Sequence, residues 1–224
     1  MKIRNRGWFV IAALLVLFLA SSAVWAGELL EKVWDNDVEA VKSLLSAGAD
    51  VNEADPQSGN TPLIFACRYN YLDMARLLID KGADVNRKAK DGSTALMMAA
   101  YASPDMVSLL IGHGADVKAR NNIGTGAFTN AVIAAMESEG TETAELLLEA
   151  GADVDEAATA GPTAGYTPLM MAALNNRPGL VSFLIAKGAD VNARAKDGTT
   201  PLALARQEGH TDVVKLLKAA GATE

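Results

Sequence analysis

The sequence predicts an all-α repeat solenoid, a stack of about six helix-turn-helix units with projecting hairpin fingers between them. The tripeptide Gly-Ala-Asp ends an apolar run five times, and successive copies lie 34, 32, 37 and 37 residues apart. Between the tripeptides, Thr-Pro-Leu or a close variant opens a second kind of apolar run. Nearly all of the chain after residue 26 follows this period, which is typical of units that bury their faces against their neighbours.

The first 26 of the 224 residues stand apart and are predicted to be a secretory signal peptide. Three cations precede an unbroken apolar run over residues 8–20, and Val24-Trp25-Ala26 fits a signal peptidase site. We expect cleavage after Ala26 and a periplasmic or secreted bacterial protein without stable membrane insertion. The alternative is an inner-membrane anchor, because residues 7–26 carry no charge and about 20 residues span a bilayer.

The periodic region opens with an amphipathic helix that lacks Thr-Pro-Leu, as expected of a terminal unit. Charged Glu28, Glu31 and Lys32 alternate there with apolar residues. We expect Trp34 to be a core residue that seals this end of the stack.

Four inner helices are predicted to begin at a threonine. The segments read NTPLIFAC from Asn60, STALMMAA from Ser93, YTPLMMAA from Tyr166 and TTPLALAR from Thr199. The threonine oxygen accepts a hydrogen bond from a free N–H of the first turn, and proline is tolerated at the next position. Small residues after the leucine then allow neighbouring helices to approach closely.

An outer helix follows each inner helix, for example over Asp73–Lys81 and Asp212–Ala220. The tripeptide glycine ends it, because a residue just past a helix terminus often needs the left-handed conformation. Asp, Asn and Gly residues then form the turns that lead into the next unit.

These motifs together resemble the ankyrin repeat: a DG turn, TPL opening an inner helix, paired alanines, a Leu-rich second helix and GAD-x-N. The resemblance covers residues 27–224, with units near 27–57, 58–90, 91–122, 123–163, 164–196 and 197–224. It implies an array with a concave face of fingers and inner helices that usually binds another protein. The histidine that usually follows TPL is replaced by Ile64, Met97, Met170 and Ala203, which makes this side more apolar.

The fourth unit is irregular. Its inner helix would start in GTGAFTNA, from Gly124, without the capping threonine or the proline, and extra residues around 136–143 separate its two helices. The finger after it, from Gly151 to Gly165, is also long. Insertions in repeat arrays often mark a binding face, although a surface loop also tolerates extra length at little cost.

Composition argues against several functions. Cleavage would remove three of the 20 Lys+Arg and none of the 27 Asp+Glu residues, which changes the net charge from −7 to −10 and disfavours nucleic-acid binding. His113, His210 and the single Cys67 are interpreted as structural. The eight methionines are interpreted as core filler, not as a copper site, because equivalent residues of different repeats lie too far apart. We therefore expect no enzyme, no metal and no cofactor.

The fingers carry the clearest candidate for partner recognition. Finger two has Arg87, Lys88 and Lys90, and finger three has Lys118 and Arg120. These five cations would form one basic patch beside the acidic finger one, which carries Glu53 and Asp55, whereas finger four carries Asp155 and Glu156. The alternative is that these charges serve only solubility.

Tyr69, Tyr101, Met97 and Met170 are the expected apolar contacts on the concave face. The sequence thus predicts a monomeric interaction module that binds a partner protein, with an acidic surface if the patch is used, as an adaptor, inhibitor, immunity factor or enzyme companion. The alternative function is a periplasmic small-molecule or metal binder that supports stress or redox defence, with its pocket at the fourth unit.

Overall fold

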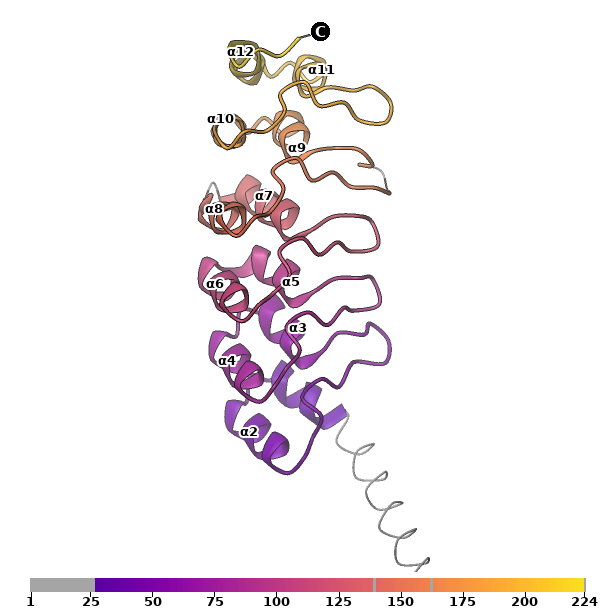
Figure 1. Cartoon of the computed structure of the whole chain (residues 1–224), viewed down its shortest axis with the longest axis vertical. Coiled ribbons are helices and arrows are strands. Elements are labelled where there is room, and N and C mark those ends of the chain that lie inside the picture. Colours follow the sequence, from indigo (N-terminus) through magenta and orange to yellow (C-terminus); the bar gives the residue numbers. More distant parts are fainter. Residues whose placement is uncertain (1–26, 139, 162, 224) are drawn as a thin grey trace, which may run out of the picture.

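Two columns of helices run the length of the molecule, and a row of fingers projects beside the inner column (Figure 1). The computed structural model describes residues 27–138, 140–161 and 163–223. The inner helices are α3 (Pro62–Arg68), α5 (Ala95–Ala102), α7 (Ala127–Ser138), α9 (Pro168–Leu174) and α11 (Pro201–Gln207). The outer helices are α2 (Val38–Ser46), α4 (Leu72–Asp80), α6 (Pro104–Gly112), α8 (Glu142–Glu149), α10 (Pro178–Ala186) and α12 (Thr211–Ala219).

The predicted solenoid of helix pairs is confirmed. Helical residues 27–34 form the inner helix that precedes α2, and no strand occurs in the part of the chain that the structure describes. The predicted signal peptide lies outside the described residues. Within the described ranges, no helix is both long enough and apolar enough to cross a membrane.

Four inner helices begin at the predicted threonines. Each hydroxyl oxygen accepts a hydrogen bond, at 3.1 to 3.4 Å, from the backbone N–H three residues later; the four caps are Thr61, Thr94, Thr167 and Thr200. The glycines that follow the outer helices have positive φ, from 82° at Gly114 to 102° at Gly48. Glycine is needed there because a side chain strains this conformation.

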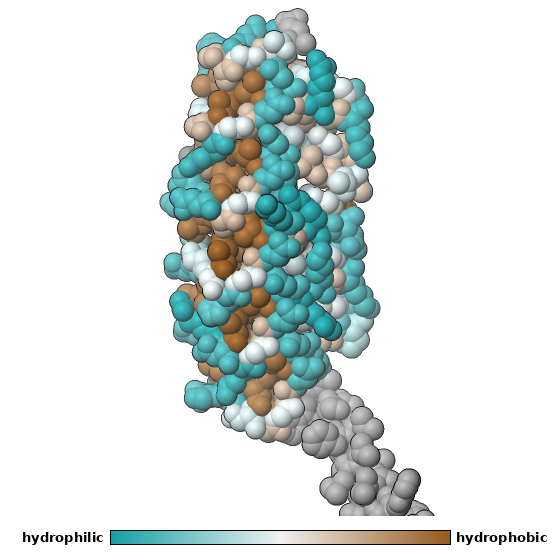
Figure 2. Space-filling view, in the orientation of Figure 1, coloured by the Kyte–Doolittle hydropathy of each residue, from teal (hydrophilic) through white to brown (hydrophobic). Residues whose placement is uncertain are grey.

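The core lies between the two columns. Consecutive inner helices from α3 onward pack on one another, as do the outer helices from α2 to α8 and the pair α10 and α12. The alanines one turn into α3, α5, α9 and α11 have no exposed surface. An apolar band is visible over the outer helices along the whole stack (Figure 2). Stability therefore comes from packing between layers, without a crosslink at the buried, unpaired Cys67.

Asparagine side chains connect consecutive turns after the outer helices. Asn52, Asn86 and Asn192 each accept a hydrogen bond at 2.7 or 2.8 Å from a backbone N–H of the following turn. Each also donates, at 3.0 to 3.4 Å, to the carbonyl of the glycine that ends the next outer helix. We call these three residues the asparagine ladder.

The ladder is interrupted on both sides of the fourth unit. Lys118 and Asp155 occupy the equivalent positions there. Asp155 accepts a hydrogen bond from the N–H of Asp190 at 3.1 Å but has no N–H to donate. Lys118 supplies neither bond. The polar link between consecutive turns is thus incomplete on both sides of the fourth unit.

The extra residues of the fourth unit lengthen its inner helix. α7 has 12 residues, whereas the other inner helices from α3 onward have 7 or 8. The expectation of an inserted loop between its helices is therefore correct only after Ser138, because residues 136–138 are helical.

A carboxylate replaces the missing threonine cap of α7. Oε1 of Glu156, from finger four, accepts hydrogen bonds from the N–H groups of Gly126 at 3.1 Å and Thr129 at 2.7 Å, and from the Thr129 hydroxyl. Its Oε2 forms an ion pair at 2.9 Å with Nη1 of Arg120, from finger three. A side chain at Gly126 would collide with both partners, because its Cβ would lie 2.5 Å from that Nη1 and 2.8 Å from Oε2.

This arrangement corrects the expected role of Glu156. The residue is not an acidic fingertip, because its side chain is fully buried. Negative charge at a helix N-terminus is favourable. The positive charge of Arg120 offsets the cost of removing the Glu156 carboxylate from water. One glutamate therefore joins finger three, α7 and finger four.

Candidate protein-binding surface

Two rows of side chains on the inner helices face the fingers. In the helices from α3 onward, they lie four and seven residues after the capping position, one helical turn apart on one face. The first row is Phe65, Met98, Asn130, Met171 and Leu204, and the second is Arg68, Tyr101, Ile133, Leu174 and Gln207. We call these two rows the concave stripe. Its middle is mostly apolar.

A hollow lies between the middle of the concave stripe and fingers three and four. Its volume is 280 Å³, and its walls include Met98, Tyr101, Ile133 and Met171 from the stripe and Ile123 from finger three. Tyr101 and Ile133 also border a neighbouring hollow of 390 Å³, together with the end of α7. The long α7 and the third and fourth fingers therefore shape one depressed region on the concave face, and Tyr101 stands at its centre.

Tyr101 is held in place although its side chain is half exposed. Its hydroxyl donates to Oδ1 of Asn130 at 3.2 Å, and Nδ2 of Asn130 donates to the carbonyl of Met97 at 2.9 Å. Burial, and secondly the charge of Glu137, raise the pKa of Tyr101 above its ordinary value of 10.0. The phenol therefore stays protonated at neutral pH and presents an ordered ring to a partner.

The expectation for the methionines is wrong by one residue. Met97 and Met170 are 1% and 0% exposed, so neither can contact a partner. Both lie three residues after the capping threonine, on the side that packs inside the stack. Met98 and Met171, expected in the core, instead border the hollow. The correct assignment could have been made from the capping threonine, because the number of residues after the cap determines which side chains face the fingers.

Exposed aromatic residues gather at the N-terminal end of the inner column. Trp34 is 55% exposed, which overturns its expected role as a core residue, and Tyr69 is 41% exposed. The ring of Trp34 lies 4.9 Å from that of Tyr69 and 6.2 Å from that of Phe65, edge to face in both cases. Leu29 and Val33 fill the core position instead. Tyr69 therefore belongs to this aromatic cluster, away from Tyr101.

Three of the five cations of the predicted basic patch make contacts within the protein. Nζ of Lys90 donates to the carbonyl of Pro56 at 2.6 Å, and Nζ of Lys88 donates to the carbonyl of Arg120 at 3.0 Å, so both lysines connect neighbouring fingers. Arg120 is neutralised by Glu156. Arg87 and Lys118 are exposed, and their side chains make no hydrogen bond or ion pair with the described residues. Four cations therefore remain without an opposite charge in contact.

The described residues contain no group of three or more His, Cys, Asp or Glu side chains that could hold a metal ion. Burial raises the pKa of the Cys67 thiol far above its ordinary value, so the reactive thiolate does not form at neutral pH. Nδ1 of His113 lies 2.8 Å from the carbonyl of Leu109, and Nε2 of His210 lies 3.0 Å from that of Leu174. Both histidines thus contact backbone carbonyls.

Comparisons with known proteins agree with this architecture. The family model "Ankyrin repeats (3 copies)" matches residues 29–121 and 129–223. The chain is 28% identical over 203 residues to the putative ankyrin repeat protein YahD of Escherichia coli, covering 83% of this chain and 92% of that protein. It is 31% identical over 194 residues to the mouse B-cell lymphoma 3 protein homolog, covering 85% and 43% of the two chains.

A third relative is the Caenorhabditis elegans ankyrin repeat and KH domain-containing protein mask-1, with 32% identity over 187 residues. This match covers 81% of the present chain but only 6% of that protein. The family model spans most of the chain, and the capped inner helices, glycine-ended outer helices and fingers follow its repeat throughout. The chain therefore belongs to the ankyrin repeat family.

Proposed function

We propose that this protein is an exported interaction module that binds a partner protein through its concave face and has no catalytic function. The observation that carries this proposal is the hollow around Tyr101, where an ordered aromatic ring and apolar side chains are accessible between rigid helices and fingers. Ankyrin repeats are found in interaction modules, and the family match extends over the stripe and, apart from residues 122–128, over the fingers.

Affinity would come from a few residues of this hollow. Binding energy at interfaces concentrates in aromatic and large apolar side chains that lose their water when the partner arrives. Tyr101 and Ile123 are 50% and 47% exposed, and they face the same hollow from a helix and from a finger. Because the backbone hydrogen bonds of the fingers hold these groups before binding, little ordering is needed.

Approach of the partner would be guided by charge. Arg87, Lys88, Lys90 and Lys118 lie on fingers two and three, and finger three also contributes Ile123 to the hollow. A lysine that donates to a carbonyl keeps its positive charge. A cluster of this kind accelerates association with an acidic surface. We therefore propose a partner with an acidic patch beside an apolar contact.

Export would place this recognition in the periplasm or outside the cell. The sequence of residues 1–26 supports this proposal, and retention of that segment as an inner-membrane anchor is the alternative. An adaptor, an inhibitor, an immunity factor and a companion of an enzyme would all use the same surface. We propose that the module acts as a monomer.

The proposal is tested by affinity capture with residues 27–224 as bait and the native envelope fraction as the source of partners. Tyr101→Ala should weaken binding of the captured protein about tenfold or more, as expected of an interface hot spot. Tyr101→Phe is the matched control, because it keeps the ring and should bind within a few fold of the natural protein. Equal binding of the Tyr101→Ala variant and the natural protein would exclude the hollow as the contact site.

A second experiment tests the charge component. The double variant Arg87→Glu and Lys118→Glu should slow association several-fold at about 20 mM salt and much less at about 500 mM, where screening is strong. Lys42→Glu with Arg76→Glu changes the net charge equally on the outer helices and serves as the control. Equal association rates of the two double variants at low salt would remove the proposed role of the fingers.

A further inference from the structure

A contact that joins neighbouring repeats recurs at the start of the outer helices. The hydroxyl of Tyr71, at the cap of α4, donates to the carbonyl of Trp34 in the preceding repeat at 3.5 Å. Nε2 of His210, at the cap of α12, lies 3.0 Å from the carbonyl of Leu174 in the preceding repeat. Each contact joins the cap of an outer helix to the end of the previous inner helix.

Arg177 occupies the equivalent position at the cap of α10 but has lost this acceptor. The corresponding carbonyl belongs to Ile133, and α7 continues past it to Ser138. Inside an α-helix that carbonyl accepts the hydrogen bond of the N–H four residues later. The buried Nε of Arg177 accordingly has no hydrogen-bond partner. Leaving this donor buried without a partner is costly. The Arg177 side chain as a whole is only partly buried, and its Nη atoms form no hydrogen bond or ion pair with the described residues, so the guanidinium can still pair with an anion from outside.

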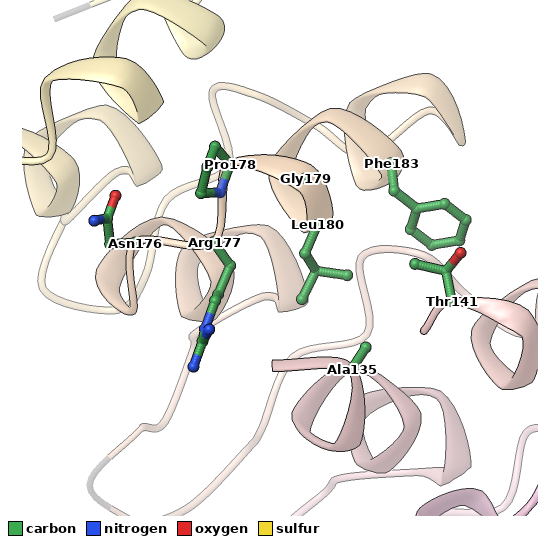
Figure 3. Close-up of a pocket in the computed structure, with 8 residues that line it drawn as sticks. All are labelled: Ala135, Thr141, Asn176, Arg177, Pro178, Gly179, Leu180 and Phe183. Atoms are coloured by element: carbon green, nitrogen blue, oxygen red, sulfur yellow. The ribbon is translucent and has the colours of Figure 1, made fainter. Parts of the chain in front are cut away.

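A cleft of 480 Å³ adjoins Arg177 (Figure 3). Leu180 and Phe183 of α10 line one side, and Ala135 of α7 and Thr141 line the other. The inner helices are packed less closely here than elsewhere in the stack, since α7 and α9 run close together over a much shorter stretch than α5 and α7 do. The volume is within the range of small-molecule sites.

Further donors lie at the same end of the cleft. No side chain caps α10, and the backbone N–H groups of Gly179 and Leu180 donate to none of the described residues. Lys187, near the far end, is already paired with Glu145 at 3.0 Å. The cleft thus offers one unpaired cation, two backbone donors and a largely apolar wall.

We propose that this cleft binds a small organic carboxylate whose body is apolar. A planar carboxylate accepts two parallel hydrogen bonds from one guanidinium, and a single free cation matches a single negative charge. The aliphatic body would cover Leu180 and Phe183. This site is separate from the concave face, so the proposal stands or falls independently of the partner-binding function.

The test uses nitrogen-15-labelled residues 27–224 and isovalerate as the probe, followed in the arginine Nε–H region of a proton–nitrogen correlation spectrum. The Arg177 signal, assigned by its loss in Arg177→Met, should shift and saturate. Isovaleramide has the same body without the charge and should cause no shift. Arg177→Met should bind isovalerate about tenfold more weakly or not at all, and Arg76→Met, on an outer helix, should bind it normally.

Stability gives a second measurement. Arg177→Met should melt at the same temperature as the natural protein or higher, since it removes an unpaired and partly buried charge, and isovalerate should raise the melting temperature only when Arg177 is present. Arg177→Lys keeps the charge without the planar fork and should bind with intermediate affinity. Absence of a saturable shift, equal binding of the amide, or unchanged binding by Arg177→Met would each overturn the proposal.

Discussion

Replacement of Glu156 by alanine should destabilise the protein more than any other single change at the fingers. The carboxylate accepts three hydrogen bonds at the start of α7 and pairs with Arg120 at 2.9 Å. Alanine removes all four interactions together. It also leaves the guanidinium of Arg120 beside buried backbone without its opposite charge.

The magnitude follows from these contacts. Loss of a helix cap costs about 1 kcal/mol. Removing one partner of a buried ion pair costs about 3 to 5 kcal/mol. Because the Arg120 side chain is 30% exposed, water screens part of this cost. We therefore expect Glu156→Ala to lower the free energy of unfolding by about 3 kcal/mol, and Glu156→Gln, which keeps an acceptor oxygen, by about half as much.

Urea denaturation followed by circular dichroism measures this change, and hydrogen exchange of the amides in α7 locates it. A rescue variant makes the test specific. In a chain with Glu156→Ala and Arg120→Ala, the two side chains that would collide with a new side chain at residue 126 are gone, and only the carbonyl of Ala119, 3.0 Å from the position of the new Cβ, must shift slightly. Gly126→Thr then restores the usual cap. It should recover about 1 kcal/mol. If Glu156→Ala unfolds within about 0.5 kcal/mol of the natural protein and α7 exchanges no faster, the cap assignment is refuted.

Three further predictions concern the ladder and the thiol. Asp155→Asn supplies the missing donor toward the carbonyl of Gly188 and should stabilise the protein by about 1 kcal/mol at pH 7 in urea titrations. Burial raises the pKa of Asp155 above its ordinary value of 3.8, so the ionised carboxylate destabilises the folded protein above the folded pKa, and this cost is absent below 3.8. The stabilisation by Asp155→Asn should therefore be smaller at about pH 3 than at pH 7. Equal stabilisation at both pH values would show that ionisation of Asp155 does not contribute. Lys118→Asn restores the interrupted link between the third and fourth units and should raise the melting temperature, whereas an unchanged value would show that the link contributes nothing. Cys67 should react with an aromatic disulfide reagent only as fast as the protein opens, and immediate labelling of the folded chain would contradict its burial.

The repeat architecture could be predicted from the sequence because its signals are local. Thr61 and Pro62 define a helix start within two residues, and Gly82 defines an end through its backbone alone. The same signals recur in most units, so errors at one unit do not change the fold. Tyr101 was expected as a contact on the concave face, and its side chain is half exposed.

Other features depend on partners that are distant in sequence. The cap of α7 comes from Glu156, 30 residues after Gly126, and no local pattern connects the two. Only the absence of a capping threonine indicated that another acceptor was required. The position of Met97 was wrong because apolar residues occupy both sides of α5, and hydrophobicity does not distinguish the two sides. Trp34 was misplaced for a related reason, since aromatic residues serve equally in cores and on binding surfaces.

The origin of the α7 cap in the following finger has a consequence for how the chain acquires its structure. Synthesis proceeds from the N-terminus, so α3 and α5 carry their own caps as soon as they are made, whereas α7 waits for a residue that is added after both helices of its unit. Truncation after Glu149 should therefore loosen the fourth unit, although every residue of its helix pair is retained. A transplant or deletion in this part of the array must therefore keep or remove the fourth repeat together with the finger that follows it.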